Sequence, residues 1–410
     1  MGGRPVHAIR MVLILAVIMV QLVSCASVEE RDPPPSSSVP TRREPSAEPP
    51  GRAVDRAERE AAIAERVLSQ MSLEQIIGQR FVTWLDGTGV TPVERRLVVE
   101  GLVGGFIVYP ANVESRAQIT ELTSDLQRFA DSANPPVGLF LASDQEGGRV
   151  SAVRLSDMPS FPASSEWARH EDTAYIEAAS YVVNRELEAL GFNMNFAPVL
   201  DVSERADDGI IGDRAFGDDP ELVGRFGPAY LRGARRAGII PVPKHFPGHG
   251  TTTVDSHGTL PVVDISLDEL FETHVLPFRE VVDYGAEAIM TAHLLLPPLD
   301  DEHPATLSRP IIDGLLREEM GFRGVVISDG FAMGAISQNY GVEEAIELSI
   351  DAGVDIILTH ARYDVAELIE TTVDLVESGR VSHSSLVAGT RRILELKVRH
   401  GLLGTSSTDR

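Results

Sequence analysis

The sequence predicts an α/β fold, most simply a (β/α)8 barrel of the TIM type in a single domain. Its 410 residues are 43% hydrophobic but only 6% aromatic, a profile that suits helices packed on a parallel sheet. Eight short apolar segments alternate with segments of helical periodicity, and polar side chains follow most of the apolar segments. These observations favour strands joined by helical crossovers, with polar residues at the carboxyl ends of the strands.

The expected strands are short apolar segments, as in sheets that are covered on both faces. We expect them at 79–84, 103–109, 137–143, 193–200, 239–244, 287–293, 324–328 and 354–359. Amphipathic periodicity predicts helices at 59–71, 118–130, 175–190, 222–237, 267–284, 311–320 and 384–400. Glycine is favoured where a helix ends in a left-handed residue, and such ends are predicted at Gly238, Gly285, Gly321, Gly353 and Gly379.

The main alternative to a barrel is an open, doubly wound sheet. The polar residues that distinguish the two folds are Asp144-Gln145-Glu146, Asp201, Lys244-His245, His293, Asp329 and His360, each placed after an expected strand. A closed barrel brings these strand ends around one mouth, whereas an open sheet spreads them along a line. The concentration of ionisable groups therefore favours the barrel.

The N-terminal segment has the composition of an export signal followed by a tether. Basic residues precede an apolar run at 11–20, which is too short for an ordinary membrane span. Leu22-Val23-Ser24-Cys25 resembles a bacterial lipobox, in which the cysteine is lipidated and becomes the mature N-terminus, and Cys25 is the only cysteine. The alternative is a plain signal peptide with an incidental cysteine. We expect a lipoprotein signal peptide at 1–24, a disordered Pro/Ser-rich tether at 25–58, the folded domain at 59–404 and a flexible tail at 405–410.

Composition and motifs exclude several classes of function. A net charge of −25 argues against nucleic acid as a partner, because the phosphate backbone would be repelled. A single cysteine allows no intrachain disulfide. The sequence also lacks a phosphate-binding loop, a Gly-x-Gly-x-x-Gly fingerprint and a Gly-x-Ser-x-Gly nucleophile elbow.

The segment 244–257 concentrates ionisable groups after the fifth expected strand. It holds Lys244, three histidines and Asp255, with glycines and prolines between them. In extended backbone Asp255 and His257 share one face, so the carboxylate can orient the imidazole for proton transfer. The simpler interpretation of these two residues is a solvated polar loop.

A metal site is a further interpretation of the same segment. His245, His249 and His257 offer three imidazoles, and the spacing of the first two is allowed for zinc. However, Pro247 and Gly248 interrupt any helix that would align them, and a lysine beside the cation would repel it. The sequence therefore favours a site without metal.

A carboxylate ends the seventh expected strand, in Val325-Val326-Ile327-Ser328-Asp329-Gly330. Asp329 thus stands at a carboxyl edge with a glycine beside it. A strand-end aspartate alone is as often a helix cap or a loop anchor as a catalytic group. The nearby segment 244–257 supplies the acid/base partner that a catalytic interpretation needs.

At these residues the chain resembles bacterial β-N-acetylglucosaminidases of glycoside hydrolase family 3. The family pattern Lys-His-Phe-Pro-Gly-His-Gly, then Asp-Ser-His and Leu-Pro, is matched at 244–250, 255–257 and 260–261. Further similar blocks are Asp144-Gln145-Glu146-Gly147-Gly148-Arg149-Val150, Asn195-Phe196-Ala197-Pro198-Val199-Leu200-Asp201, Asp213-Arg214-Ala215-Phe216-Gly217, Pro304-Ala305-Thr306-Leu307-Ser308 and Ser328-Asp329. They follow the family order over roughly 65–400.

The resemblance implies a TIM-barrel catalytic domain and a retaining mechanism without metal or organic cofactor. Asp329 would be the nucleophile, and His257, oriented by Asp255, would be the general acid/base in place of a second carboxylate. The positions that hold the sugar would be Asp144, Arg214, Lys244 and His245. Carboxylates accept hydrogen bonds from sugar hydroxyls, while arginine and lysine donate them.

Two positions depart from the family pattern. After Val150 the family commonly continues Gln-Arg, with the arginine contacting the sugar, but here Ser151-Ala152 follow and the next arginine is Arg154. That contact is therefore not carried over. The nucleophile is often followed by a second aspartate, where this chain has Gly330.

The sequence therefore predicts an exo-β-N-acetylglucosaminidase that removes terminal N-acetylglucosamine from peptidoglycan or muropeptides. We expect a monomer, exported to the cell envelope, outside the inner membrane, and attached to a membrane surface through Cys25. The alternatives are a glycoside phosphorylase with the same covalent intermediate, a non-catalytic wall-binding lipoprotein, and a β-glucosidase or β-xylosidase of the same family.

Overall fold

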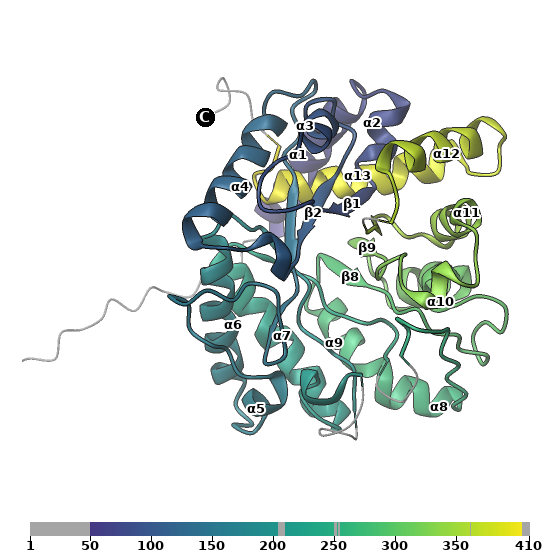
Figure 1. Cartoon of the computed structure of the whole chain (residues 1–410). Helices are drawn as coiled ribbons and strands as arrows, with labels where there is room; N and C mark the ends of the chain where they lie inside the picture. Colours follow the sequence, from purple (N-terminus) through teal and green to yellow (C-terminus); the bar gives the residue numbers. More distant parts are fainter. Residues whose placement is uncertain (1–49, 204–209, 250–251, 253–254, 361, 404–410) are drawn as a thin grey trace, which may run out of the picture. The chain divides into compact units, whose positions relative to one another are not determined.

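The structure is a computed structural model that describes residues 50–203, 210–249, 252, 255–360 and 362–403, with the side chains of 50–55 excepted. Within this part of the chain, helices surround a group of parallel strands (Figure 1). None of the described helices is long and apolar enough to cross a membrane. The predicted signal peptide, the predicted lipidation site Cys25 and the predicted C-terminal tail at 405–410 lie outside the described residues.

All eight expected strands are present, each shorter than predicted. They are β1 Phe81–Trp84, β2 Gly105–Val108, β3 Phe140–Ser143, β6 Met194–Asn195, β7 Ile240–Pro241, β8 Ala288–Met290, β9 Val325–Ile327 and β10 Ile357–Leu358. Two further strands, β4 Gln145–Gly147 and β5 Val150–Ser151, form an antiparallel hairpin that was not predicted.

The parallel strands form two sheets. Six strands pair in the order β10-β1-β2-β3-β6-β7, and β8 pairs with β9. This six-stranded sheet is a parallel half-barrel, so the predicted α/β class is confirmed, whereas the strand ladders do not run continuously around a closed barrel. Pro241 and Pro243 lie in the fifth expected strand and lack the N–H group that a ladder needs, which explains the interruption after β7.

The expected helices are present, together with shorter ones. The α-helices are α1 Pro50–Leu68, α2 Leu73–Gly78, α3 Pro92–Val99, α4 Arg116–Ala130, α5 Ser164–Ala168, α6 Thr173–Glu188, α7 Pro220–Ala237, α8 Leu267–Glu269, α9 Leu276–Asp283, α10 Gly334–Ser337, α11 Val342–Ala352, α12 Val365–Glu377 and α13 His383–Arg399. Two π-helical segments are η3 Leu270–His274 and η5 Pro310–Glu319, and the 3-10 segments are η1 Pro110–Asn112, η2 Gly212–Arg214 and η4 Ala305–Leu307. The five glycines predicted to end helices all have positive φ, between 74° and 102°.

Two helices differ from the prediction. The helix expected at 267–284 is divided into α8, η3 and α9, because Pro277 cannot donate the backbone hydrogen bond that would continue one helix. α1 begins at Pro50, inside the segment predicted to be a tether up to residue 58. Arg56 and Glu60 lie one turn apart with 3.5 Å between Nε and Oε1, a pairing that supports the earlier start.

The buried core has an inner and an outer part. The inner cluster contains a side chain from each of the eight parallel strands: Val82, Ile107, Phe140, Met194, Ile240, Met290, Ile327 and Leu358. The outer cluster is larger and packs the helices against the strands. The polar residues that follow the strands therefore lie just beyond an apolar interior that all eight strands share.

Candidate active site

A group of six ionisable side chains lies beyond the carboxyl ends of β3, β6 and β7. It consists of Asp144, Glu146, Asp201, Arg214, Lys244 and His245, and is called the strand-end cluster below. The Lys244 side chain is only 3% exposed, with Nζ 2.5 Å from Asp144 Oδ1 and 2.7 Å from Glu146 Oε1. Burial lowers the pKa of Lys244, but the two carboxylates outweigh burial and raise it overall, so the ammonium stays charged.

Glu146 is the buried centre of the strand-end cluster. Arg214 binds it with both ends of its guanidinium, Nε to Oε2 and Nη2 to Oε1, each at 2.8 Å. Burial alone would raise the pKa of Glu146, but Arg214 and Lys244 outweigh it and lower that pKa to about 2. Glu146 is therefore an anion that fixes the direction of both cations.

Asp201 plays the corresponding part for His245. Its carboxylate is fully buried, lies 2.6 Å from Nδ1 of His245 and accepts the backbone N–H of His249 at 2.6 Å. Burial raises the pKa of Asp201, but the interaction with His245 outweighs it and lowers that pKa to about 2. This contact leaves Nε2 of His245 3.4 Å from Nη2 of Arg214.

The β4–β5 hairpin places the two acidic members of the cluster that follow β3. Gln145 donates its backbone N–H to Oδ1 of Asn195, and Asn195 returns Nδ2 to the Gln145 carbonyl, both at 3.1 Å. Asn195 is the last residue of β6, so this reciprocal pair fastens the hairpin to the neighbouring strand. Asp144 on one side of Gln145 is partly exposed, while Glu146 on the other side is buried.

Asp329 stands beyond the carboxyl end of β9, where it accepts the backbone N–H of Gly330 at 2.8 Å. Burial raises the pKa of Asp329, but His245, His293 and the Gly330 N–H together outweigh it and lower that pKa below its usual value. The structure therefore brings Asp329 within electrostatic reach of the strand-end cluster and keeps it ionised.

Asp255 and His257 form a pair on an exposed turn. Nδ1 of His257 lies 2.9 Å from Oδ1 of Asp255, and the backbone N–H of His257 donates to the same oxygen at 2.9 Å. The two side chains are 69% and 56% exposed, respectively. Burial raises the pKa of Asp255, but the hydrogen bonds from His257 outweigh it and lower that pKa. The carboxylate thus orients the ring and leaves Nε2 open.

The turn formed by 255–258, called the acid/base turn below, is held by α10. Gly334 donates its backbone N–H to the His257 carbonyl at 2.9 Å, and Ala335 donates to the Ser256 carbonyl at 3.0 Å. A Cβ at Gly334 would lie only 2.5 Å from the Gly258 carbonyl oxygen, so this close approach requires glycine. The segment that carries Asp329 therefore continues into the helix that holds His257.

The three histidines considered for a metal site have separate partners. His245 pairs with Asp201 and His257 with Asp255, while Nε2 of His249 lies 3.3 Å from Ser256 Oγ. Burial lowers the pKa of His249 to about 4. Across the part of the chain that the structure describes, no three His, Cys, Asp or Glu side chains are grouped to hold a metal ion.

Three rings at neighbouring strand ends are called the aromatic wall below. Trp84, Tyr109 and His360 follow or end the adjacent strands β1, β2 and β10. The Trp84 and His360 rings are stacked with centroids 5.2 Å apart, and Tyr109 lies 5.9 Å from His360. Burial raises the pKa of Tyr109, and the nearby charges of Asp144 and Asp329 raise it further.

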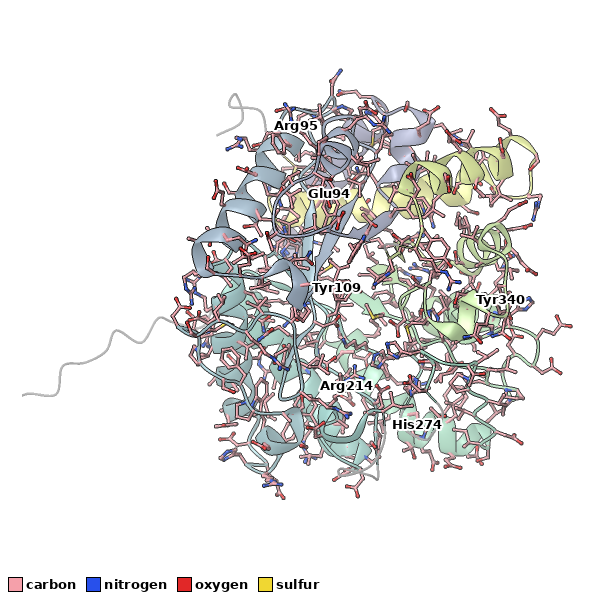
Figure 2. The ribbon with its side chains drawn as sticks, viewed as in Figure 1. Glu94, Arg95, Tyr109, Arg214, His274 and Tyr340 are labelled. Carbon is pink, nitrogen blue, oxygen red and sulfur yellow. The ribbon has the colours of Figure 1, made fainter. Side chains whose placement is uncertain are left out.

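Tyr109 thus lies within electrostatic reach of Asp144 and Asp329, and Figure 2 shows Tyr109 and Arg214 in the central region of the molecule. Burial lowers the pKa of Arg214, but Glu146 outweighs burial and raises that pKa overall, with smaller contributions from Asp201 and Asp144. Asp144 therefore influences both the strand-end cluster and the aromatic wall.

His293 supports the residue next to Asp329. Its ring is fully buried, with Nδ1 2.8 Å from Thr306 Oγ1 and Nε2 3.1 Å from the Gly330 carbonyl. Burial lowers the pKa of His293, although the nearby Asp329 opposes this effect. His293 stands out in the sequence by its place at the end of an expected strand, but its contact with the Gly330 carbonyl is visible only in the structure.

Glu146 and Asp201 follow expected strands in the sequence, but the sequence assigned no role in the site to either residue. The available signal was their position inside blocks that resemble the family. Trp84 and Tyr109 gave no such signal, because an isolated aromatic residue at a strand end looks like a core residue. Arg154 donates a hydrogen bond to the backbone carbonyl of Arg149 at 2.7 Å. This contact gives no reason to assign to Arg154 the sugar contact that the family arginine makes.

Comparison with known families gives a match over most of the chain. Residues 70–396 match the model of the glycosyl hydrolase family 3 N terminal domain. The matched region spans every member of the strand-end cluster, the acid/base turn and Asp329. It therefore covers the whole candidate site.

Individual relatives agree with this family. A β-hexosaminidase A from Pseudoalteromonas piscicida is 33% identical over 335 residues, covering 76% of this chain and 56% of its own length. A β-hexosaminidase from Stenotrophomonas maltophilia is 34% identical over 311 residues, covering 73% of this chain and 88% of its own length. The solved structure of a glycoside hydrolase family 3 β-N-acetylglucosaminidase from Paenibacillus sp. str. FPU-7 is 37% identical with a TM-score of 0.78, covering 82% of this chain and 64% of that one. The chain belongs to glycosyl hydrolase family 3.

Proposed function

We propose that the protein is a retaining exo-β-N-acetylglucosaminidase with Asp329 as nucleophile. The observation that carries this proposal is the position of an ionised Asp329 beside the strand-end cluster, on the segment whose continuation holds the Asp255–His257 pair. The Asp329 carboxylate attacks the anomeric carbon as the glycosidic C–O bond breaks, which forms a covalent glycosyl-enzyme.

His257 moves the protons in both steps. In the first step it gives a proton to the leaving oxygen, and in the second it takes a proton from the water that attacks the glycosyl-enzyme. Asp255 holds Nδ1, so Nε2 is the nitrogen that exchanges the proton. A neutral imidazole after the first step avoids a second anion beside the glycosyl ester.

The strand-end cluster binds the sugar that is released. Asp144 accepts from sugar hydroxyls, and Arg214 and Lys244 donate to sugar oxygens, while His245 offers Nε2 for a hydrogen bond to the sugar. Glu146 and Asp201 lie behind them and fix their directions. The aromatic wall offers ring faces against which the apolar C–H groups of a sugar pack.

The substrate is peptidoglycan or muropeptides carrying a terminal β-linked N-acetylglucosamine. Relatives named β-hexosaminidase and β-N-acetylglucosaminidase support N-acetylglucosamine as the sugar that is removed. The lipobox-like segment at Cys25 supports export and a lipid anchor, which would bring the enzyme to wall material outside the inner membrane. We further propose that the protein works as a monomer and needs no cofactor.

We also propose that the two parallel sheets belong to one closed (β/α)8 barrel in a single domain. The inner core cluster with a side chain from every strand supports this proposal. So do the single parallel bridges Phe246–Thr291 and Ile327–Ile356, which span the two gaps between the sheets. A barrel of this kind carries its active site at the carboxyl ends of its strands.

The test is hydrolysis of an aryl β-N-acetylglucosaminide by Asp329→Ala. We expect at least a 10³-fold loss of kcat with the circular dichroism spectrum and Tm close to those of the wild type. Asp283→Asn, at an exposed carboxyl at the end of α9, is the matched control and should keep full activity. Unchanged turnover in Asp329→Ala would refute the mechanism.

Product analysis then separates hydrolysis from phosphorolysis. The wild type is incubated with and without phosphate, and the released sugar is identified by mass. Free N-acetylglucosamine in both reactions supports the hydrolase, while a glycosyl phosphate formed only with phosphate would assign a phosphorylase. Defined muropeptides, used as substrates in the same assay, test the proposed substrate class.

A further inference from the structure

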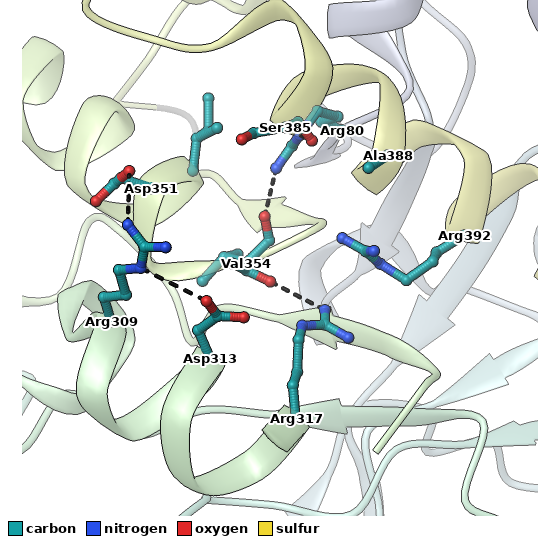
Figure 3. A pocket seen from close by; sticks show the side chains of 11 residues that line it. Arg80, Arg309, Asp313, Arg317, Asp351, Val354, Ser385, Ala388 and Arg392 are labelled. Atoms are coloured by element: carbon teal, nitrogen blue, oxygen red, sulfur yellow. Dashed lines mark hydrogen bonds and ion pairs between the residues drawn. The ribbon is translucent and has the colours of Figure 1, made fainter. Parts of the chain in front are cut away.

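A group of arginines lies at the amino-terminal ends of β1, β9 and β10, away from the strand-end cluster. A cavity of about 190 Å³ opens there, many times the ~15 Å³ that a single water needs. Figure 3 shows the side chains that line it, which include Arg80, Arg309, Asp313, Arg317, Asp351 and Arg392. This cavity is called the basal pocket below.

The buried part of the basal pocket carries more positive than negative charge. Asp355 is fully buried and accepts from Arg317 Nη2 at 2.7 Å and from Arg392 Nη2 at 2.8 Å. Arg80 is 2% exposed and donates only to backbone carbonyls, including that of Leu386 at 3.2 Å. Three guanidinium groups therefore gather around one carboxylate.

The pKa of Arg80 responds to burial and to this excess of positive charge. Burial lowers the pKa of Arg80 to about 10, because the nearby Asp355 does not offset burial and the repulsion from Arg392 and Arg317. The guanidinium is still charged at neutral pH. An anion in the pocket would relieve the repulsion that the single carboxylate leaves.

Two donors in the basal pocket lack an acceptor. Among the described residues, Nε of Arg80 and Nε of Arg317 are buried and have no hydrogen-bond partner, although Arg317 as a whole is only 8% exposed. A buried donor without an acceptor costs about 1–3 kcal/mol, and such groups are rare in folded proteins. Both arginines line the basal pocket, while the two Nε atoms themselves are buried from solvent.

The first turns of α13 add to the positive potential. Ser385 and Ala388, in the N-terminal half of this long helix, also line the basal pocket. The N-terminal end of a helix carries a partial positive charge that favours anions. The helix thus reinforces the three guanidinium groups.

The rim limits what can enter. Arg309 lies 3.5 Å from Asp313 and 3.9 Å from Asp351, and the Asp351 side chain is 66% exposed. These two carboxylates face an approaching anion from the rim, so a long polyanion would be repelled along its length. The rim therefore favours a small anion that passes below it.

We propose that the basal pocket binds a small tetrahedral oxyanion of the phosphate or sulfate class. The guanidinium groups of Arg80, Arg317 and Arg392, which line the pocket, supply the positive charge that holds the anion. The site is independent of the proposed glycosidase chemistry, because its residues lie at the other end of the strands from Asp329.

The test measures binding of sulfate and of inorganic phosphate to the purified protein by calorimetry and by thermal unfolding. N-acetylglucosamine is present at saturating concentration to keep the anion out of the active site, and chloride at matched ionic strength is the reference. We expect both oxyanions to raise the Tm above the chloride reference in a concentration-dependent manner. An equal Tm in all three salts, or binding that N-acetylglucosamine abolishes, would overturn the proposal.

Two variants and a control locate the site. Arg80→Met should weaken sulfate binding at least tenfold and leave glycosidase activity unchanged. Asp351→Asn, at an exposed rim position that does not endanger folding, should tighten binding about two- to fivefold because one repelling charge is removed. Arg391→Gln is the matched control, since Arg391 lies beside Arg392 on α13 but pairs with Glu65 outside the pocket. Equal affinities in Asp351→Asn and Arg391→Gln would contradict the assigned position, even if Arg80→Met fails to fold.

Discussion

The strand-end cluster and the acid/base turn differ in burial and have different parts in the proposed mechanism. The side chains of Lys244, Glu146 and Asp201 are 3%, 2% and 0% exposed, and each has a side-chain partner within 2.8 Å. The side chains of His257 and Asp255 are 69% and 56% exposed, and the turn that carries them is attached through backbone hydrogen bonds to α10. One region is buried and paired before substrate arrives, whereas the other remains open to water.

The difference follows from what each region does in the proposed mechanism. Groups that recognise sugar hydroxyls must keep fixed directions, and burial among opposite charges provides that order. A group that gives and takes a proton in each turnover must exchange protons with water, which an exposed imidazole does. Changes in the strand-end cluster should therefore affect binding and stability, while changes in the turn should affect kcat.

The largest expected effect that separates the two regions is that of His257→Ala. We expect kcat/KM to fall about 10²–10⁴-fold for a substrate with a poor leaving group, since proton transfer to the leaving oxygen is lost. The loss in kcat/KM should be much smaller for an aryl substrate whose leaving group needs no proton, although kcat falls for both substrates because His257 also activates the water of the second step. Steady-state kinetics with both substrates provide the measurement, and an equal loss in kcat/KM for both would contradict the role of His257 as the acid.

Glu146→Gln tests the buried region in the same way. Removing this charge leaves Lys244 and Arg214 without their common partner, so we expect kcat/KM to fall about 10²-fold, with a large share in KM. Glu186→Gln, at a partly exposed glutamate on α6 that pairs with Arg116, is the matched control and should keep wild-type kinetics. A loss in kcat alone would show that Glu146 does more than orient the cluster.

Gly334→Val tests whether α10 positions the acid/base turn. The added side chain would collide with the Gly258 carbonyl, so the turn must shift while the strand-end cluster stays in place. We expect kcat to fall about tenfold with little change in the affinity for N-acetylglucosamine. Gly341→Ala, at a glycine with no neighbour within 4 Å of an added Cβ, is the control. Weaker binding of N-acetylglucosamine in Gly334→Val would argue that the two regions are not separate.

A smaller effect is expected at the aromatic wall. Trp84→Ala removes the ring stacked on His360, so we expect KM to rise about three- to tenfold with kcat nearly unchanged. Trp84→Phe should recover most of the affinity, because a ring face is retained. Unaltered KM in Trp84→Ala would exclude the wall from substrate binding.

Stability at low pH distinguishes the buried from the exposed carboxylates. The pKa of Glu146 is lowered from 4.5 to about 2 and that of Asp201 from 3.8 to about 2, so both stabilise the fold above their unfolded values. That stability is lost as the pH falls from about 4.5 towards 2. We expect Tm to drop in this window and the drop to be shallower in Glu146→Gln. Asp255→Asn should stay closer to the wild type, because the Asp255 side chain is 56% exposed. A wild-type slope in Glu146→Gln would contradict the low pKa.

The parts of the fold that could be predicted depend on local sequence. Hydrophobic periodicity located the eight strands, and Gly238 or Gly353 marked a helix end because φ must be positive there. The β4–β5 hairpin was not predicted, since it depends on the contact between Gln145 and Asn195. The break in the 267–284 helix could have been read from Pro277.

Some contacts of the candidate site could likewise be predicted from local sequence, and others could not. Lys244, His245, Asp255 and His257 lie within one motif, so their proximity could be inferred from the sequence. The central contact of Glu146 with Arg214 joins residues 68 positions apart, and only the folded chain brings them together. The aromatic wall likewise depends on β10 pairing beside β1, which no local pattern encodes.

The central claim is that Asp329 forms a covalent bond to the sugar. The most direct measurement uses a fluorinated N-acetylglucosaminyl fluoride, which slows hydrolysis of the glycosyl-enzyme, followed by mass spectrometry of the intact protein and its peptides. If Asp329 is the nucleophile, we expect one added sugar per chain, located at Asp329 and absent from Asp329→Ala. A sugar bound to any other residue, or turnover of the reagent with no adduct under conditions that trap retaining enzymes, would contradict it.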